Sequence, residues 1–358
     1  MTKMKVGLVL SGGGAIGAYQ VGMVRALCEL GVEVHSVSGA SIGALNGAIL
    51  ASAPSLLEGT HRLESLWCQL AINSPLDINK SVYLKLLLAT GLKFNYASKL
   101  LPVINAVKKV AAPYISSLKH IPTDITSDGL LSDKPLTDLM EKYLDLDGLK
   151  CGLPFYVSVY KSKGGILDIL SCVSAELGIT DTSPSEFIHI QNLPQSEQKE
   201  VLLASAALPL LFKPKTIGKN SYSDGGMGGW SKSHGNTPIQ PLIDAGCNMV
   251  IVSHLCDGSL WSRHDFPDTT ILEIRPQSSL SRNTGIFGGA KDLLGFTPEN
   301  INSWISQGYE DTRKTVSHIM KPVLSRQSLN QSESCLQASM DKNQLADDNL
   351  ADAMKLIS

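Results

Sequence analysis

A single serine lies between two glycines in the pentapeptide Gly39-Ala40-Ser41-Ile42-Gly43, and the Gly-x-Ser-x-Gly pattern occurs once in the chain. An apolar, strand-like run precedes it at residues 32–37, and a helix-like run follows it at residues 44–50. This strand–turn–helix pattern is typical of a nucleophile elbow, where a tight turn exposes the serine hydroxyl and the helix N-terminus directs N–H groups at the reacting centre. The pattern therefore favours a serine acyl-transfer enzyme, with Ser41 as nucleophile, over an ordinary turn.

A second glycine cluster, Gly12-x-Gly14-x-x-Gly17, comes earlier, between a strand-like run at residues 4–10 and a helix-like run at residues 19–30. Its letters match the dinucleotide-binding fingerprint, but that function also needs an acidic residue at the far end of the second strand, where this chain has small residues. No Gly-Lys-Ser/Thr follows, so a P-loop is excluded as well. We therefore interpret the cluster as an oxyanion loop, in which the N–H groups of Gly13 and Gly14 bind a carbonyl oxygen as it becomes negative.

A serine nucleophile needs a base, and the chain offers both histidines and carboxylates. None of the eight histidines stands in a recognisable triad context, and only His234 and His254 are kept as candidates. A carboxylate serves instead when burial brings its pKa near the working pH. Asp224 is the favoured carboxylate, because glycines 225, 226, 228 and 229 open space beside it and an apolar, proline-limited segment precedes it.

Together these motifs resemble those of the bacterial patatin-like phospholipase family. The resemblance covers roughly residues 4–255 and rests on three motifs in order, Gly12 to Gly17, Gly39 to Gly43 and Asp224 to Gly226. Two flanking stretches, Ala204 to Phe212 and Asn236-x-Pro238, also match. Ile16 departs from the Arg or Lys of many bacterial members, which leaves the substrate branch open.

The resemblance implies a three-layer α/β/α fold with a mainly parallel central sheet and a helical insertion that acts as a cap. It implies a lipid acyl hydrolase that cleaves carboxylic ester bonds of phospholipids or lysophospholipids through a Ser41–Asp224 dyad and an acyl-enzyme. The N–H groups of Gly13, Gly14 and Ile42 are expected to form the oxyanion hole. The remaining motif glycines are Gly12, Gly17, Gly39, Gly43, Gly225 and Gly226. No metal and no cofactor is expected.

The composition bounds the other properties of the chain. Its 358 residues favour one α/β catalytic domain with insertions, and the net charge of −2 argues against nucleic acid as a partner. Seven irregularly spaced cysteines indicate reduced thiols, and the absence of an 18-residue apolar run indicates no obvious membrane span. We expect a cytoplasmic protein; export as an effector and the oligomeric state are left open.

The most unusual composition falls at residues 78–123, which hold seven lysines and no acidic residue among leucine-rich runs. This predicts amphipathic helices that either contact an anionic membrane surface or form a cap packed on the catalytic domain. We expect the catalytic domain to span residues 4–325, followed by a polar, weakly ordered tail at residues 326–358 with a short terminal helix.

Several further elements are predicted between the motifs. They are helices at residues 134–144 and 299–319, paired strands at residues 155–160 and 166–173 around a Gly164-Gly165 turn, and strands at residues 248–252 and 271–274.

Two other function classes stay open from sequence alone. A soluble acyltransferase or thioesterase would use a related serine elbow with a histidine partner. A non-catalytic membrane- or protein-binding module would keep the fold but is expected to lose part of the motif set. Because Ser41, the oxyanion loop and Asp224 are all intact, a hydrolase is favoured.

Overall fold

The computed structural model describes residues 4–72, 134–176, 178–209, 212–256, 260–283, 292–293 and 295–355. The predicted lysine-rich insertion at residues 78–123 lies outside these described residues. The chain divides into two compact units, Met1–Asp311 and Thr312–Ser358.

The first unit is built on an eight-stranded sheet with the order β5-β6-β3-β2-β1-β7-β8, and β4 also pairs with β3. The neighbours β1–β2, β1–β7, β2–β3 and β7–β8 are parallel, whereas β3–β4, β3–β6 and β5–β6 are antiparallel. The strands are β1 Val6–Leu10, β2 Ser36–Ala40, β3 Phe155–Lys161, β4 Glu186–His189, β5 Lys215–Ile217, β6 Asn220–Asp224, β7 Met249–Ser253 and β8 Thr270–Ile274. Every residue of β1, β2 and β7 is buried, as expected for parallel strands covered on both faces.

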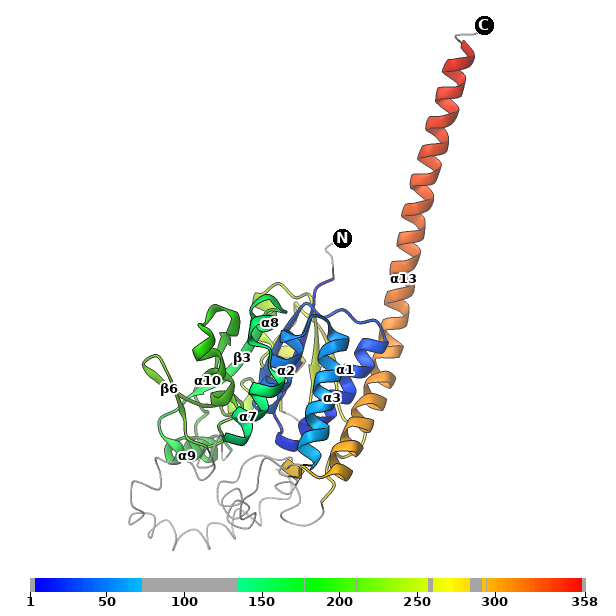
Figure 1. The fold of residues 1–358 in the computed structure, drawn as a ribbon. Coiled ribbons are helices and arrows are strands. Elements are labelled where there is room, and N and C mark those ends of the chain that lie inside the picture. The colour runs from blue at the N-terminus through cyan, green and yellow to red at the C-terminus, as the bar shows by residue number, and fades with distance from the viewer. Residues whose placement is uncertain are drawn as a thin grey trace, which may run out of the picture. The chain divides into compact units, whose positions relative to one another are not determined.

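Helices cover one face of this sheet (Figure 1). α2 (Ile42–Ser52) packs on β1, β2 and β3, and α3 (Leu56–Ile72) packs on both α1 (Ala18–Glu29) and α2. Three further helices extend the same layer: α7 (Lys134–Tyr143), α8 (Leu146–Cys151) and α10 (Gln195–Ser205). The short 3-10 helix η1 (Gly14–Gly17) lies between β1 and α1.

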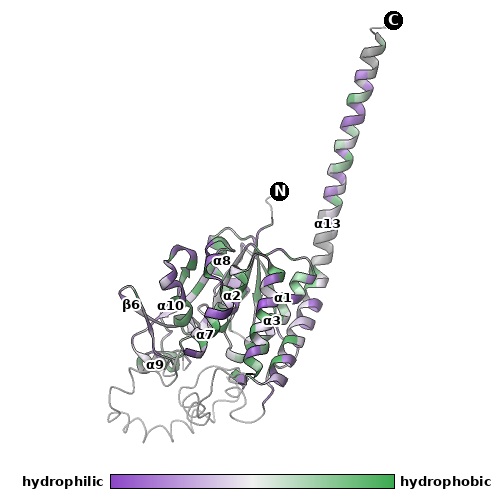
Figure 2. Ribbon diagram, viewed as in Figure 1, coloured by the Kyte–Doolittle hydropathy of each residue, from purple (hydrophilic) through white to green (hydrophobic). Residues whose placement is uncertain are grey.

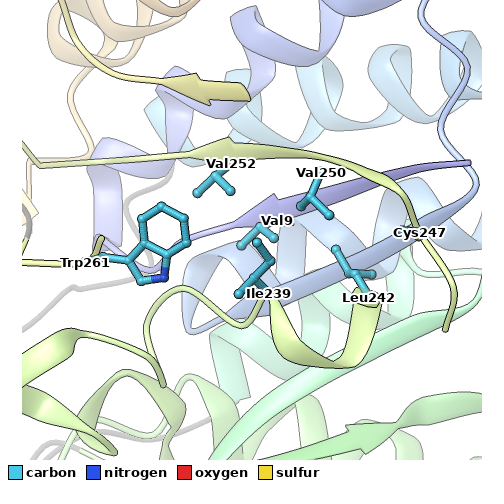
Figure 3. Packing of buried hydrophobic residues seen from close by; sticks show 7 residues of the cluster. All are labelled: Val9, Ile239, Leu242, Cys247, Val250, Val252 and Trp261. Atoms are coloured by element: carbon cyan, nitrogen blue, oxygen red, sulfur yellow. The ribbon is translucent and has the colours of Figure 1, made fainter. Parts of the chain in front are cut away.

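The opposite face is covered by α11 (Gln240–Asp244) and the segment that contains Trp261. Ile239 and Leu242 pack there against Val9 of β1 and against Val250 of β7, as Figure 3 shows. The result is the predicted α/β fold, with a mainly parallel sheet between layers of helix. The strands predicted at residues 155–160, 248–252 and 271–274, and the helix predicted at residues 134–144, are confirmed within one or two residues.

Two local predictions need correction. The second strand is β2 at Ser36–Ala40 rather than residues 32–37, so the strand runs directly into the serine turn. Residues 166–173 are not a strand but part of α9 (Gly165–Glu176). A helix is favoured there because its buried residues Ile169, Cys172 and Ala175 recur at helical spacing, and the last two pack on Tyr160 and Trp230.

The last helix is α13, which runs from Pro298 to Lys355 and crosses the boundary between the two units. The chain is therefore helical where weak order was predicted after residue 325, and the first compact unit ends at Asp311. Where Figure 2 colours α13, hydrophilic and hydrophobic residues are mixed, and Leu329, Leu336 and Met340 of the second unit are exposed. Among the helices of the described residues, none is both long enough and apolar enough to cross a bilayer.

Candidate active site

Ser41 occupies the turn between β2 and α2 in a backbone conformation that few residues adopt. Its φ of 52° and ψ of −126° make it one of two non-glycine residues with positive φ among those the structure describes. Such a conformation costs about 1–3 kcal/mol and persists only where the surroundings hold it. The strained strand-to-helix turn is the geometry that the sequence predicted for a nucleophile elbow.

The two glycines of the elbow are required by close backbone approaches. A Cβ on Gly39 would collide with the carbonyl of Gly43, and a Cβ on Gly43 would collide with the carbonyl of Leu10 at the end of β1. Since backbone atoms cannot move aside as a flexible side chain does, the turn admits only glycine at both positions. The elbow is thereby packed against the start of the glycine loop.

Ser205, at the end of α10, fixes the backbone of the elbow. Its hydroxyl accepts a hydrogen bond from the N–H of Ser41 at 3.0 Å and donates one to the carbonyl of Ser158 in β3 at 2.7 Å. Ser205 is fully buried. This role is not predictable from the sequence, where Ser205 is only a small polar residue inside an apolar segment.

Asp224 ends β6 and is 4% exposed. Its Oδ1 accepts the N–H of Gly226 at 2.8 Å, whereas its buried Oδ2 has no hydrogen-bond partner among the described residues. Burial raises the pKa of Asp224 to about 6, while hydrogen bonds from the Ser41 hydroxyl and the Gly226 N–H lower it in part. Two residues far apart in sequence, Ser41 and Asp224, are thus brought close together.

The glycine loop lies directly beside Ser41. A Cβ on Gly12 would stand 2.9 Å from Cβ of Ser41 and 2.6 Å from Oδ1 of Asn236, so only glycine allows this approach. Gly14 has a φ of +56°, in the left-handed region that favours glycine. The N–H groups of Gly13 and Gly14 donate no hydrogen bond to any described residue. Ile42 opens α2, where the first N–H groups have no intrahelical acceptor.

Asn236 and Thr237 join the glycine loop to the Asp224 turn. Asn236 Oδ1 accepts the N–H of Gly12 at 3.1 Å, and the hydroxyls of Thr237 and Ser11 lie 3.2 Å apart. A Cβ on Gly226 would approach the same Asn236 oxygen to 2.9 Å. In the sequence, Asn236 is only part of the stretch Asn236-x-Pro238, and these contacts are not predicted by it.

The two histidines kept as candidates are bonded elsewhere. His254 is buried, its Nε2 lies 3.1 Å from Oε2 of Glu273, and burial lowers its pKa. His234 is more exposed, with Nε2 3.3 Å from Oδ2 of Asp265. No hydrogen bond within the described ranges joins either imidazole to Ser41.

An apolar pocket begins next to the elbow. Its wall is formed by α2, α3, α7 and α10, together with Phe296. The lining residues include Ile42, Leu45, Leu66, Leu70, Met140 and Leu202. Because Ile42 directly follows Ser41 in the chain, the pocket lies near the serine turn.

The fold and this arrangement define a serine-elbow α/β protein, and comparison with known families places it further. Residues 8–243 match the family model described as patatin-like phospholipase, which is more than half of the chain. The chain belongs to this family. The matched stretch contains Ser41, Asp224 and the whole glycine loop.

Relatives among characterised proteins match over short segments. The chain is 39% identical over 106 residues to the patatin-like phospholipase domain-containing protein ZK370.4 of Caenorhabditis elegans, covering 28% of this chain and 7% of that protein. It is 32% identical over 130 residues to the mouse patatin-like phospholipase domain-containing protein 7, covering 36% and 9%. The matched segments thus span less than a tenth of these relatives. Since these relatives are animal proteins, the bacterial branch of the family stays a prediction.

Among solved structures, the fold is similar to that of VipD from Legionella pneumophila, with 18% sequence identity and a TM-score of 0.38. That similarity covers 88% of this chain and 67% of VipD.

Proposed function

We propose that this chain is a lipid acyl hydrolase that uses Ser41 as nucleophile and Asp224 as its base. One observation carries the proposal: the buried Asp224 carboxylate has one oxygen bonded to Gly226 and the other without a described partner, and the Ser41 hydroxyl is close enough to lower its pKa. A carboxylate whose pKa is raised to about 6 is largely ionised at neutral pH yet more basic than an exposed one. Such a group can accept the serine proton without a histidine.

The reaction would run through an acyl-enzyme. Ser41 Oγ attacks the ester carbonyl while its proton passes to Asp224, and the carbonyl oxygen becomes negative. The N–H groups of Gly13, Gly14 and Ile42 are the donors that would hold this oxyanion; one donor is typically worth about 3 kcal/mol. The carbon–oxygen bond to the alcohol then breaks, and the alcohol leaves with the proton from Asp224. In the second half, Asp224 takes a proton from water as the water oxygen attacks the acyl carbonyl. The bond between the acyl carbon and Ser41 Oγ then breaks, the fatty acid leaves, and Ser41 recovers the proton from Asp224.

The substrate class is supported by the pocket and by the family. An apolar pocket that starts at Ile42 suits a fatty acyl chain whose ester carbonyl lies at Ser41. We therefore propose phospholipids or lysophospholipids as substrates, with the acyl chain between α2, α3 and α7. The catalytic domain is proposed to span residues 4–325, which includes the insertion at residues 78–123.

The alternative of a Ser–His acyltransferase or thioesterase is less well supported. His254 is bonded to Glu273 and His234 to Asp265, and burial disfavours the charged form that His254 would have to adopt after accepting a proton. A non-catalytic module would not need the strained backbone of Ser41 or the buried Asp224.

The proposal is tested with Ser41→Ala, Asp224→Asn, His234→Ala and His254→Ala in the full chain. Purified proteins are incubated with a mixed lipid extract, and released fatty acids and lysolipids are identified by mass spectrometry. We expect the first two variants to lose on the order of 10⁴-fold in rate and the histidine variants less than about tenfold.

Circular dichroism of each variant provides the control for folding. Near-normal hydrolysis by a folded Asp224→Asn protein would reject the dyad. A histidine variant that falls as far as Ser41→Ala would identify a triad instead.

A further inference from the structure

The glycine loop is held at both ends by buried amide side chains that the catalytic proposal does not use. Gln20 Nε2 donates to the carbonyl of Ser11 at 2.7 Å, and Asn46 Nδ2 donates to the carbonyl of Gly17 at 3.2 Å. Gln20 lies on α1 and Asn46 on α2, and both are fully buried. Two different helices therefore fix the first and last carbonyls of the segment that carries Gly13 and Gly14.

The two amides are also bonded to each other and to a tryptophan on α3. Asn46 Nδ2 donates to Gln20 Oε1 at 2.8 Å, and Trp67 Nε1 donates to Asn46 Oδ1 at 3.0 Å. An indole N–H can only donate, so the Asn46 oxygen must face Trp67 and its NH₂ group must face the loop. This orientation in turn directs Gln20 Oε1 at Asn46 and Gln20 Nε2 at Ser11. The indole N–H of Trp67, which can only donate, thus fixes the direction of every hydrogen bond among Trp67, Asn46, Gln20 and the loop carbonyls.

The network is fully satisfied although it is buried. Both polar atoms of Gln20, both of Asn46 and the indole nitrogen of Trp67 have hydrogen-bond partners. Buried polar networks of this kind are costly when one partner is missing and rigid when complete. Asn46 also belongs to the helix that begins directly after Ser41, so the same helix carries the nucleophile turn and holds the loop.

We infer that Trp67, Asn46 and Gln20 form a positioning network that sets the glycine loop relative to Ser41. The inference rests on the proposed hydrolase function. None of the three residues needs to contact substrate; they act through the loop, whose other side is held by Asn236 at the N–H of Gly12. With these groups bonded, the N–H groups of Gly13 and Gly14 remain to face a reacting carbonyl. Misplacing such donors by about 1 Å can cost about 100-fold in rate.

The test uses Gln20→Met, which keeps a similar volume but removes both hydrogen bonds, and Trp67→Phe, which removes only the fixed donor. We expect kcat for a small soluble ester to fall about 10- to 100-fold in Gln20→Met, with KM within about threefold, because donors to the oxyanion act mainly in the transition state. Trp67→Phe should show a smaller fall of the same kind. Amide hydrogen exchange of peptides covering residues 11–17 should accelerate in both variants.

Gln198→Met is the matched control. Gln198 is an equally buried amide on α10, 2% exposed, whose Nε2 donates to the carbonyl of Leu193 at 3.0 Å, remote in sequence from the loop. We expect it to leave kcat and the exchange of residues 11–17 unchanged, which separates positioning from general loosening of the fold.

Unchanged exchange of residues 11–17 in both folded network variants would overturn the inference, as would an equal fall of kcat in Gln198→Met. If Gln20→Met does not fold, Trp67→Phe alone decides in the same way. Wild-type protein that hydrolyses no ester would reject the proposed function instead, while the exchange measurement would still decide whether the network holds the loop.

Discussion

At the scale of single residues, Asp224 is held in surroundings that oppose its own ionisation. The carboxylate is buried, receives one backbone N–H bond, and has no cation among its described partners. This environment makes the carboxylate a better base. It also lowers the stability of the fold when the carboxylate is ionised, and that loss can be measured. Two predictions follow from the direction of its pKa shift.

The first concerns the pH dependence of hydrolysis. Because Asp224 must be ionised to accept the Ser41 proton, kcat/KM for a soluble ester should decrease as the pH falls through about 6. Rates measured between pH 4.5 and 8 would show a single acid limb. His254→Ala and His234→Ala should keep that limb, and its disappearance in either variant would assign it to a histidine.

The second concerns stability. Burial raises the pKa of Asp224 from an ordinary value of 3.8 to about 6 in the folded chain, so the protonated form is favoured in the fold. The contribution of Asp224 to the free energy of unfolding is therefore fully present below pH 4 and is lost as the pH rises through 6. Asp224→Asn cannot ionise and should be more stable than wild type at pH 8, by at most about 3 kcal/mol. Urea unfolding at pH 4 and pH 8 measures this difference.

The exposed Asp268 supplies the control for that experiment, because Asp268→Asn should change stability little at either pH. An Asp224→Asn protein that is less stable than wild type at pH 8 would contradict the assignment of burial as the main cause of the shift.

At the scale of elements, the candidate site lies where several elements meet. β2 ends at the serine turn, β1 runs into the glycine loop, and β6 ends at Asp224. Parallel β1 and β2 bring the first two turns to the same edge of the sheet, while antiparallel β6 reaches that edge by pairing with β3. Ser205 ties α10 to this junction through the N–H of Ser41.

Ser205→Ala should therefore impair catalysis without changing substrate binding. The change leaves the Ser41 N–H and the Ser158 carbonyl without their described partner, at a cost of about 1–3 kcal/mol in unfolding free energy. We expect kcat to fall about tenfold with little change in KM, as measured on a soluble ester. Ser52→Ala removes a similarly buried hydroxyl that bonds within α2, to the carbonyl of Ile49, and should leave kcat unchanged. Equal kinetics for both variants would contradict a role for Ser205 in holding the elbow.

At the scale of the whole molecule, the insertion at residues 78–123 is proposed to bring the catalytic domain to an anionic membrane surface. Its lysines should give binding to anionic vesicles that weakens with salt, at about 1 kcal/mol for each lysine near the surface. Replacing Lys85, Lys93, Lys108 and Lys109 with glutamate should lower hydrolysis of vesicle phospholipid and leave a small soluble ester unaffected.

Replacing the same four lysines with arginine keeps the charge and serves as the control. Equal effects of the glutamate substitutions on vesicle and soluble substrates would reject membrane contact, and the insertion would then be a packed cap.

The sequence by itself determined the features that depend on local constraints. Only glycine at positions 12, 39 and 43 permits the close backbone approaches around Ser41. The turns could therefore be located from the positions of these glycines in the sequence. The apolar runs around them predicted β1, α1 and α2 because buried strands and helices carry characteristic periods. The residues proposed as nucleophile and base were likewise named from these motifs.

Only the tertiary structure decided what depends on neighbours distant in sequence. Residues 166–173 are apolar enough for a strand, but they belong to α9, from which Cys172 packs in a cluster with Tyr160 and Trp230. The pKa of Asp224 follows from burial, which no local pattern contains. Ser205, Asn236 and the Gln20–Asn46–Trp67 network are ordinary polar residues in sequence; they gain a role because folding brings their donors and acceptors to the ends of the glycine loop and to the elbow.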